Sequence, residues 1–152
     1  MALSHKDADN GHTADSQLLH ASAVAIAGRG LLVVGPSGSG KSSLALALMG
    51  MGAMLVADDR TVVTRAGEAL LADAPDRLRG LIEARHVGLL AAEAAGPVPV
   101  ALVVDLSGPR AARLPGLGRA VLCGIAVPRV TARFAPELAP ALRQLLIGGL
   151  AP

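Results

Sequence analysis

The chain has 152 residues, of which 52% are hydrophobic and 17% charged, with a formal net charge of +2. This length suits one domain with a sizeable core, and because Phe134 is the only aromatic residue, that core must be filled by Ala, Val and Leu. Scattered arginines without stacking aromatics argue against a nucleic-acid partner, no apolar run reaches the ~18 residues of a membrane span, and the single Cys123 excludes an internal disulfide and suits a reducing cytoplasm.

The first residues, 1–17, are polar and lack periodicity, and they do not resemble a signal peptide. We expect them to form a flexible tail, with one folded domain over residues 18–152. Residues 20–27 alternate with period two at Ala, Val and Ile, which predicts a strand. A tight turn at residues 28–30 would fold residues 31–34 back against this strand as a hairpin.

The next stretch, LLVVGPSGSGKSS at residues 31–43, reads as a buried strand, a glycine-rich loop and the start of a helix. It matches G-x-x-x-x-G-K-[ST], the phosphate-binding P-loop. Glycines let the loop curl so that its N–H groups point at phosphate oxygens, and the helix adds its positive end. Lys41, one of only two lysines, would reach the β- and γ-phosphates, and the Ser42 hydroxyl would ligate Mg²⁺. The predicted nucleotide-binding residues are Gly35, Pro36, Ser37, Gly38, Ser39, Gly40, Lys41, Ser42 and Ser43.

Beyond the P-loop, the chain alternates between apolar runs and turn signals. Residues 41–50 predict a helix, and residues 53–59 predict a strand that ends in two acids. The remaining elements that we expect are a hairpin over 60–65 and 68–73, a helix over 75–85, a short strand over 87–90, a loop over 91–99, a strand over 100–105, a loop over 107–118, a strand-like run broken at Gly124 and Pro128 over 120–130, and a helix over 135–146. This order predicts an α/β fold with a mixed β-sheet.

Two strand ends carry acids that could serve the nucleotide. Asp105 ends the run LVVD, which resembles a Walker B strand whose acid holds Mg²⁺; alternatively, it caps the loop after the strand. Asp58 and Asp59 end the strand that follows the P-loop. Since alternate side chains of a strand point to opposite faces, one of the pair is expected to face the γ-phosphate as a base toward a hydroxyl. The alternative is a turn-forming Asp pair that opens the next hairpin.

Five stretches stand in an order known from one family. They are His20, the P-loop, LVADDR at residues 55–60, LIEAR at 81–85 and VPRVT at 127–131. Over roughly residues 18–134 the chain thus resembles the catalytic domain of HPr kinase/phosphorylase, enzymes that phosphorylate a serine of the small phosphocarrier protein HPr. The resemblance implies an α/β P-loop kinase domain with the HPr kinase/PEP carboxykinase-like nucleotide-binding core, in its short single-domain form.

The resemblance also implies which residues are catalytic. Asp58 looks like the proton acceptor that takes the proton of the target serine and returns it in the reverse reaction. Lys41 would steady the charge that develops on the γ-phosphoryl group. His20 matches a histidine near the catalytic Asp, where it could polarise or orient it. Arg113 matches a catalytic arginine, although Ala112 stands where the family has an acid.

Further matches concern cofactors, partners and regulation. Ser42 and Glu83 look like the Mg²⁺-associated positions, with ATP as the nucleotide, and Arg85 matches the arginine of a family signature in which glycine follows, where this chain has His86. The implied partner is an HPr-like phosphocarrier protein in phosphotransferase-system regulation. Kinase activity is better supported than phosphorolysis, because the region tied to phosphorolysis survives only as residues 127–131. A homo-oligomer is left open.

Two other functions remain as alternatives. One is a different P-loop kinase or NTPase that uses Asp105 as its Walker B acid. The other is a module that senses ATP and binds a partner without transferring phosphate. Substitution of Asp58 or of Asp105 would separate the kinase from the first alternative, and phosphate transfer to a serine would separate it from the second.

Overall fold

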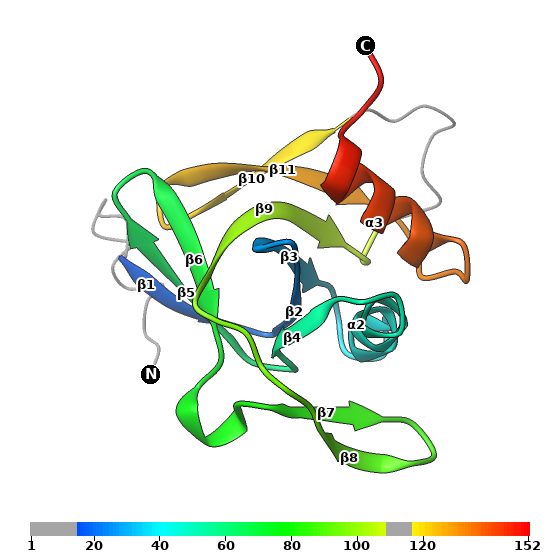
Figure 1. Cartoon of the computed structure of the whole chain (residues 1–152). Helices are drawn as coiled ribbons and strands as arrows, with labels where there is room; N and C mark the ends of the chain where they lie inside the picture. Colours follow the sequence, from blue (N-terminus) through cyan, green and yellow to red (C-terminus); the bar gives the residue numbers. More distant parts are fainter. Residues whose placement is uncertain (1–14, 109–116) are drawn as a thin grey trace.

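The computed structural model describes residues 15–108 and 117–152 (Figure 1). Its elements, in chain order, are β1 (Ser16–Leu19), β2 (Ala21–Ile26), β3 (Arg29–Val34), α2 (Lys41–Met49), β4 (Met54–Ala57), β5 (Thr61–Ala66), β6 (Ala69–Asp73), the 3₁₀ helix η1 (Asp76–Leu78), β7 (Leu81–Ala84), β8 (Gly88–Ala91), β9 (Val98–Asp105), β10 (Gly118–Leu122), β11 (Ile125–Thr131) and α3 (Leu138–Gly148). The α/β class predicted from the sequence is therefore correct.

Nine of the strands described here form one curled sheet, in the order β1-β5-β6-β9-β3-β2-β4, with β11 paired to β9 and β10 to β11. β3 and β9 run parallel, as do β9 and β11, and the other pairs of this sheet are antiparallel. The sheet is thus mixed, as expected. β7 and β8 form a separate hairpin that projects on the side of α2 (Figure 1).

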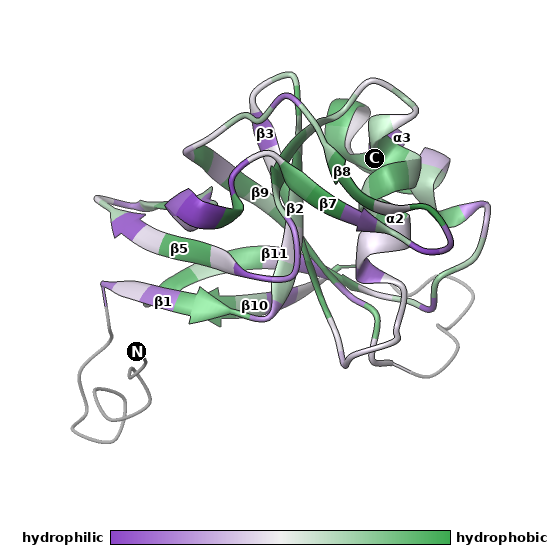
Figure 2. Cartoon of the chain, turned by 90° about the horizontal axis from the view of Figure 1, so that it is seen from below, coloured by the Kyte–Doolittle hydropathy of each residue, from purple (hydrophilic) through white to green (hydrophobic). Residues whose placement is uncertain are grey.

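The central strands bury both faces. Leu31 and Val33 of β3 pack in a cluster with α2 and α3, whereas Leu32 packs in a second cluster with Val63 of β5 and Val127 of β11. This alternation follows from the two-residue period of a strand, and the near-continuous apolar colouring of β9 in Figure 2 is typical of parallel strands covered on both sides. Neither helix in the described ranges is long and apolar enough to cross a membrane.

One predicted boundary and one predicted helix are wrong. Ser16 and Gln17, expected in the tail, belong to β1 and pair with Thr64 and Val63 of β5. The helix expected over residues 75–85 is instead a 3₁₀ turn followed by strand β7. In β7, Ile82 is fully buried and Glu83 exposed, so the burial has a two-residue period. Of the charged residues that suggested a helix, only Glu83 lies in this strand.

Local anchors fix where this hairpin begins. Gly80 has φ +78, which a helix does not tolerate, and ends the 3₁₀ turn. Arg79 Nη1 donates to Asp73 Oδ1 at 2.6 Å, and Nη2 donates to Asp76 Oδ1 at 3.2 Å. These hydrogen bonds raise the pKa of Arg79, the one to Asp73 most. They tie the start of β7 to the end of β6, which places Glu83 beside the P-loop helix.

The other predicted elements differ in detail. The first hairpin turns at Ala27–Gly28, both with positive φ, so its turn precedes the predicted one by a residue. The run 120–130 is a hairpin, because Cys123 and Gly124 (φ +49 and +78) form a two-residue turn of the type that joins tightly paired strands. The expected loop over residues 107–118 lies mostly outside the described residues.

Candidate active site

The P-loop lies at the edge of the sheet where parallel strands end. β3 leads directly into Gly35, and residues Gly35, Gly38 and Gly40 all have φ between +83 and +148, a region that favours glycine. The Ser39 N–H donates to Pro36 O at 3.1 Å, which closes the loop. α2 begins at Lys41 without a side-chain cap, so its first N–H groups face the loop and can receive an anion.

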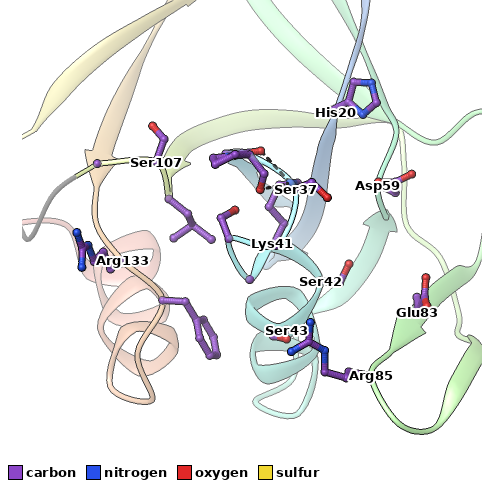
Figure 3. Close-up of a pocket in the computed structure, with 18 of the residues that line it drawn as sticks. His20, Ser37, Lys41, Ser42, Ser43, Asp59, Glu83, Arg85, Ser107 and Arg133 are labelled. Atoms are coloured by element: carbon purple, nitrogen blue, oxygen red, sulfur yellow. Dashed lines mark hydrogen bonds between the residues drawn. The ribbon is translucent and has the colours of Figure 1, made fainter.

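Lys41 reaches back across this loop. Its Nζ donates to Gly35 O at 2.8 Å and to Pro36 O at 3.0 Å (Figure 3). The ammonium therefore lies over the centre of the curl, where phosphate oxygens could replace the two carbonyl oxygens. This is the position that the P-loop interpretation requires of the lysine.

A cavity of about 1250 Å³ opens over the P-loop. On one side of the loop lie His20, Asp59 and Glu83, and on the other lie Ser107 and Arg133 (Figure 3). The complete lining is His20, residues 35–43, Asp59, Glu83, Arg85, His86, Leu106, Ser107, Gly108, Arg133 and Phe134. The structure thus brings the predicted loop, His20 and Glu83 to one cavity, which is larger than a phosphate group needs.

Asp58 lies beneath the cavity rather than in its wall. The residue is 8% exposed, and its carboxylate accepts three hydrogen bonds: from Ser22 Oγ at 2.8 Å, from Ser42 Oγ at 2.6 Å and from the Glu83 N–H at 3.0 Å. Because the Ser42 hydroxyl donates its hydrogen bond to Asp58, the lone pairs of Ser42 Oγ stay available for a cation. Asp58 therefore orients the P-loop serine, and each of its oxygens already accepts at least one hydrogen bond.

Asp59 takes the opposite orientation and lines the cavity. Its φ is +66, and the Arg60 N–H donates to Asp58 O at 2.7 Å across it, which describes a strained γ-turn. Strand β2 holds this turn at both ends: Ala21 N donates to Asp59 O at 3.2 Å, and Asp59 N donates to Ser22 Oγ at 3.3 Å. Such strain persists only where the surroundings impose it, and it is common at functional sites.

The structure thus separates the two acids. Sequence reasoning expected one of the pair to face the nucleotide, and the resemblance pointed to Asp58. The acid in the cavity wall is Asp59, and the side chain of Asp58 points to the Ser42 hydroxyl. The signal that could have distinguished them is the turn itself, since the strand ends at Ala57 and its alternation does not extend through the pair.

His20 lies above Asp59 in Figure 3, just before β2. The Arg60 guanidinium contacts its ring, with Nη1 at 3.0 Å from Nε2. Glu83 and Arg85 approach from the β7–β8 hairpin on the same side of the loop. The residues carried over by resemblance therefore gather around the P-loop, apart from Arg113, which lies outside the described residues.

Asp105 does not take the Walker B position. It ends β9, but its carboxylate accepts hydrogen bonds from the N–H of Ser107, at 2.8 Å, and from the Ser107 hydroxyl. It does not line the cavity, whereas Asp58 contacts the P-loop serine. Asp105 therefore caps the loop after its strand, which is the alternative that the sequence left open.

The few oxygen-bearing side chains beside the P-loop suit a cation that keeps most of its bound water. Among the described residues, no group of three or more His, Cys, Asp and Glu side chains could enclose a metal. Ser42 and Glu83 nevertheless line the same cavity, with Asp58 behind the serine. Mg²⁺ typically keeps several waters and takes one or two protein oxygens plus substrate phosphates, so this sparse donor set fits it.

Comparison with known proteins identifies relatives of this chain. Residues 11–95 match the family model "HPr Serine kinase C-terminal domain". Two similar curated proteins, both named HPr kinase/phosphorylase, are from Lactobacillus delbrueckii subsp. bulgaricus, 34% identical over 131 residues (78% of this chain and 42% of the relative), and from Chloroherpeton thalassium, 43% identical over 79 residues (51% and 23%). The chain therefore spans less than half the length of these relatives.

A solved structure is also similar. The Hpr(Ser) kinase/phosphatase from Coxiella burnetii superposes with a TM-score of 0.73 at 26% identity, and the match covers 86% of this chain and 93% of that one. The arrangement of the mixed sheet and P-loop is thus shared with a protein of comparable length. The family match covers the P-loop, Asp59 and Glu83, which line the cavity, and also Asp58, which contacts the P-loop serine.

Proposed function

Because the chain belongs to the HPr serine kinase C-terminal domain family, we propose that it is an ATP-dependent protein kinase that phosphorylates a serine of HPr or of an HPr-like phosphocarrier protein. One observation carries this proposal: a P-loop whose serine is hydrogen-bonded to Asp58, with Asp59 turned into the cavity above it. That arrangement supplies a phosphate site and a free carboxylate side by side, which is what transfer from a nucleotide to a hydroxyl requires.

The P-loop is the proposed site of the ATP phosphates. N–H groups of residues 35–43 and Lys41 would bind the phosphate oxygens. Ser42 and Glu83 would hold Mg²⁺, which when bound neutralises charge on the β- and γ-phosphates. Asp58 would keep Ser42 in the orientation that leaves its lone pairs free, a role supported by the 2.6 Å contact.

Asp59 is the proposed proton acceptor, in place of Asp58. The serine hydroxyl of the carrier would attack the γ-phosphorus in line: a bond forms between the serine oxygen and phosphorus, the bond to the ADP oxygen breaks, and the serine proton passes to Asp59. Asp58 is less suited, because its oxygens already accept hydrogen bonds from two hydroxyls and one N–H. His20, held against Arg60, is proposed to polarise or orient Asp59.

The alternative enzyme with Asp105 as Walker B acid is less well supported, since that carboxylate is engaged by Ser107. The same hypothesis includes a cytoplasmic location, which the single cysteine suits. It also includes phosphorolysis of the phosphoserine, which the family resemblance implies, and leaves self-association open. Arg113 remains a predicted catalytic residue.

The test is incubation of the protein with γ-labelled ATP, Mg²⁺ and an HPr-type phosphocarrier, followed by mapping of the labelled residue. Label on one serine supports the kinase, and its release by added inorganic phosphate supports phosphorolysis. ATP binding without label on any serine would instead favour a nucleotide sensor. A carrier in which the labelled serine is replaced by alanine is the control.

A further inference from the structure

The cavity extends well past the P-loop on the side away from Asp59. Three parallel strands end in register there, because Val34 of β3 pairs with Asp105 of β9, which pairs with Thr131 of β11. The ladder continues into the loops, with Leu106 N donating to Val34 O at 2.9 Å and Ala132 N donating to Asp105 O at 3.0 Å. In α/β sheets, ligands bind outside the carboxyl ends of such strands.

The third of these loops brings the chain's only aromatic residue to the cavity. Phe134 is 41% exposed and lines it, although an aromatic ring gains more by full burial. Its position is fixed by the P-loop: a Cβ built on Gly40 would lie 2.9 Å from Phe134 Cβ and 3.1 Å from Cγ. Glycine at position 40 therefore makes room for this side chain as well as for the loop's own curl (φ +103).

The surroundings of Phe134 complete an amphipathic surface. Leu106, in the loop after β9 and only 5% exposed, adds an apolar wall. Arg133, which precedes Phe134 in the loop after β11, adds an exposed guanidinium. Among the described residues no carboxylate forms an ion pair with Arg133. An aromatic face and a cation beside an apolar wall are suited to a planar heteroaromatic ring.

We propose that Phe134, with Arg133 and Leu106, forms the nucleobase subsite, where the base of the nucleoside triphosphate stacks on the phenyl ring. This inference rests on the proposed function, because it assumes that a nucleoside triphosphate occupies the P-loop. It also gives the nucleotide a direction. The base lies on the side of Arg133 and Ser107, and the γ-phosphate points toward Asp59 and Glu83, so the phosphocarrier approaches from the side of the β7–β8 hairpin.

The experiment compares ligands with and without a base. Affinities of ATP and of inorganic tripolyphosphate are measured by calorimetry for the wild-type chain, Phe134→Ala, Phe134→Leu and Phe134→Tyr, with thermal unfolding of each. Loss of one stacking aromatic is expected to weaken ATP binding about tenfold in the Ala and Leu variants, while tripolyphosphate binding stays unchanged and Tyr retains wild-type affinity. Val121→Ala, at a 68% exposed site on β10 outside the cavity, is the control.

Two results would overturn the subsite. One is equal weakening of ATP and tripolyphosphate, which would mean that Phe134 acts only by shaping Gly40 and the P-loop. The other is unchanged ATP affinity in a folded Phe134→Leu protein. Failure of the kinase proposal has a different signature: no serine is labelled by the wild-type protein, although the contrast between ATP and tripolyphosphate persists.

Discussion

Substitution of the two adjacent aspartates separates the proposed base from its neighbour. In Asp59→Asn the side chain keeps its size, and Asn tolerates the left-handed φ of +66 better than most residues. Asp59 is exposed and its carboxylate accepts no hydrogen bond from another described residue. Removing a general base costs roughly 10²–10⁴-fold in rate, and an exposed substitution shifts Tm by less than about 2 °C. We therefore expect transfer to fall by that factor while ATP binding and Tm stay near wild type.

Asp58→Asn should instead lower the stability of the fold. Its carboxylate accepts hydrogen bonds from two hydroxyls on one oxygen and from the Glu83 N–H on the other. One orientation of an amide sets two donors against each other at Glu83, and the other forces Ser22 and Ser42 to rotate. A buried unpaired donor costs about 1–3 kcal/mol, which for a chain of this size lowers Tm by roughly 2–12 °C.

The assays are serine labelling with γ-labelled ATP, calorimetric ATP binding and thermal unfolding, applied to both variants. The reasoning would be refuted if Asp59→Asn kept wild-type turnover while a folded Asp58→Asn protein, with unchanged Tm, lost it. In that case the buried carboxylate would have to leave its three donors and act as the base.

Other substitutions test the rest of the site. Lys41→Met should lower transfer by about two orders of magnitude, since it removes the cation expected to stabilise the transferring phosphoryl group, with Tm as the control for folding. Ser22→Ala removes the buried hydroxyl that donates to Asp58 and accepts the Asp59 N–H, so kcat should fall with little change in ATP affinity; unchanged kcat would show that the turn holds Asp59 without it. Gly40→Ala should abolish ATP binding, because its Cβ would meet Phe134 at 2.9 Å, whereas Gly38→Ala, with open space around it, should retain more affinity. Burial raises the pKa of the Cys123 thiol, so less thiolate forms at pH 8 than in a free cysteine and a disulfide reagent should react slowly until the chain is unfolded; fast reaction of the folded protein would contradict its buried position.

The conformation of the P-loop was predictable from sequence because the motif fixes both residue type and spacing. A P-loop needs glycines where φ is positive, and the residues at positions 35, 38 and 40 have φ values that other residues rarely adopt. The strands β5 and β6 were also predictable, because a turn signal separates these two short runs. Each of these signals lies within a few neighbouring residues, so no tertiary information is needed to interpret it.

The sequence-based predictions failed where contacts between distant parts of the chain decide the local structure. Residues 75–85 carry charges at helix-like positions, yet burial of Ile82 under α2 imposes a strand. Ser22 gave no signal at all, since a serine in an apolar strand is unremarkable until its partner, 36 residues away, is known. Phe134 was visible as the only aromatic, but its place beside the P-loop depends on the pairing of β11 with β9.

The division of work between the two aspartates follows from electrostatics and from the turn between them. Two free carboxylates beside a triphosphate would repel it and each other. Asp58 accepts hydrogen bonds from three donors and does not line the cavity. A regular strand would send Asp59 to the far face of the sheet, but the γ-turn with φ +66 redirects it into the cavity. The strain of that turn, of order 1–3 kcal/mol, is offset by the hydrogen bonds from Ala21 N to Asp59 O and from Asp59 N to Ser22 Oγ. Strand β2 therefore positions both aspartates directly, since Ser22 donates to the Asp58 carboxylate and Ala21 and Ser22 hydrogen-bond to the backbone of Asp59.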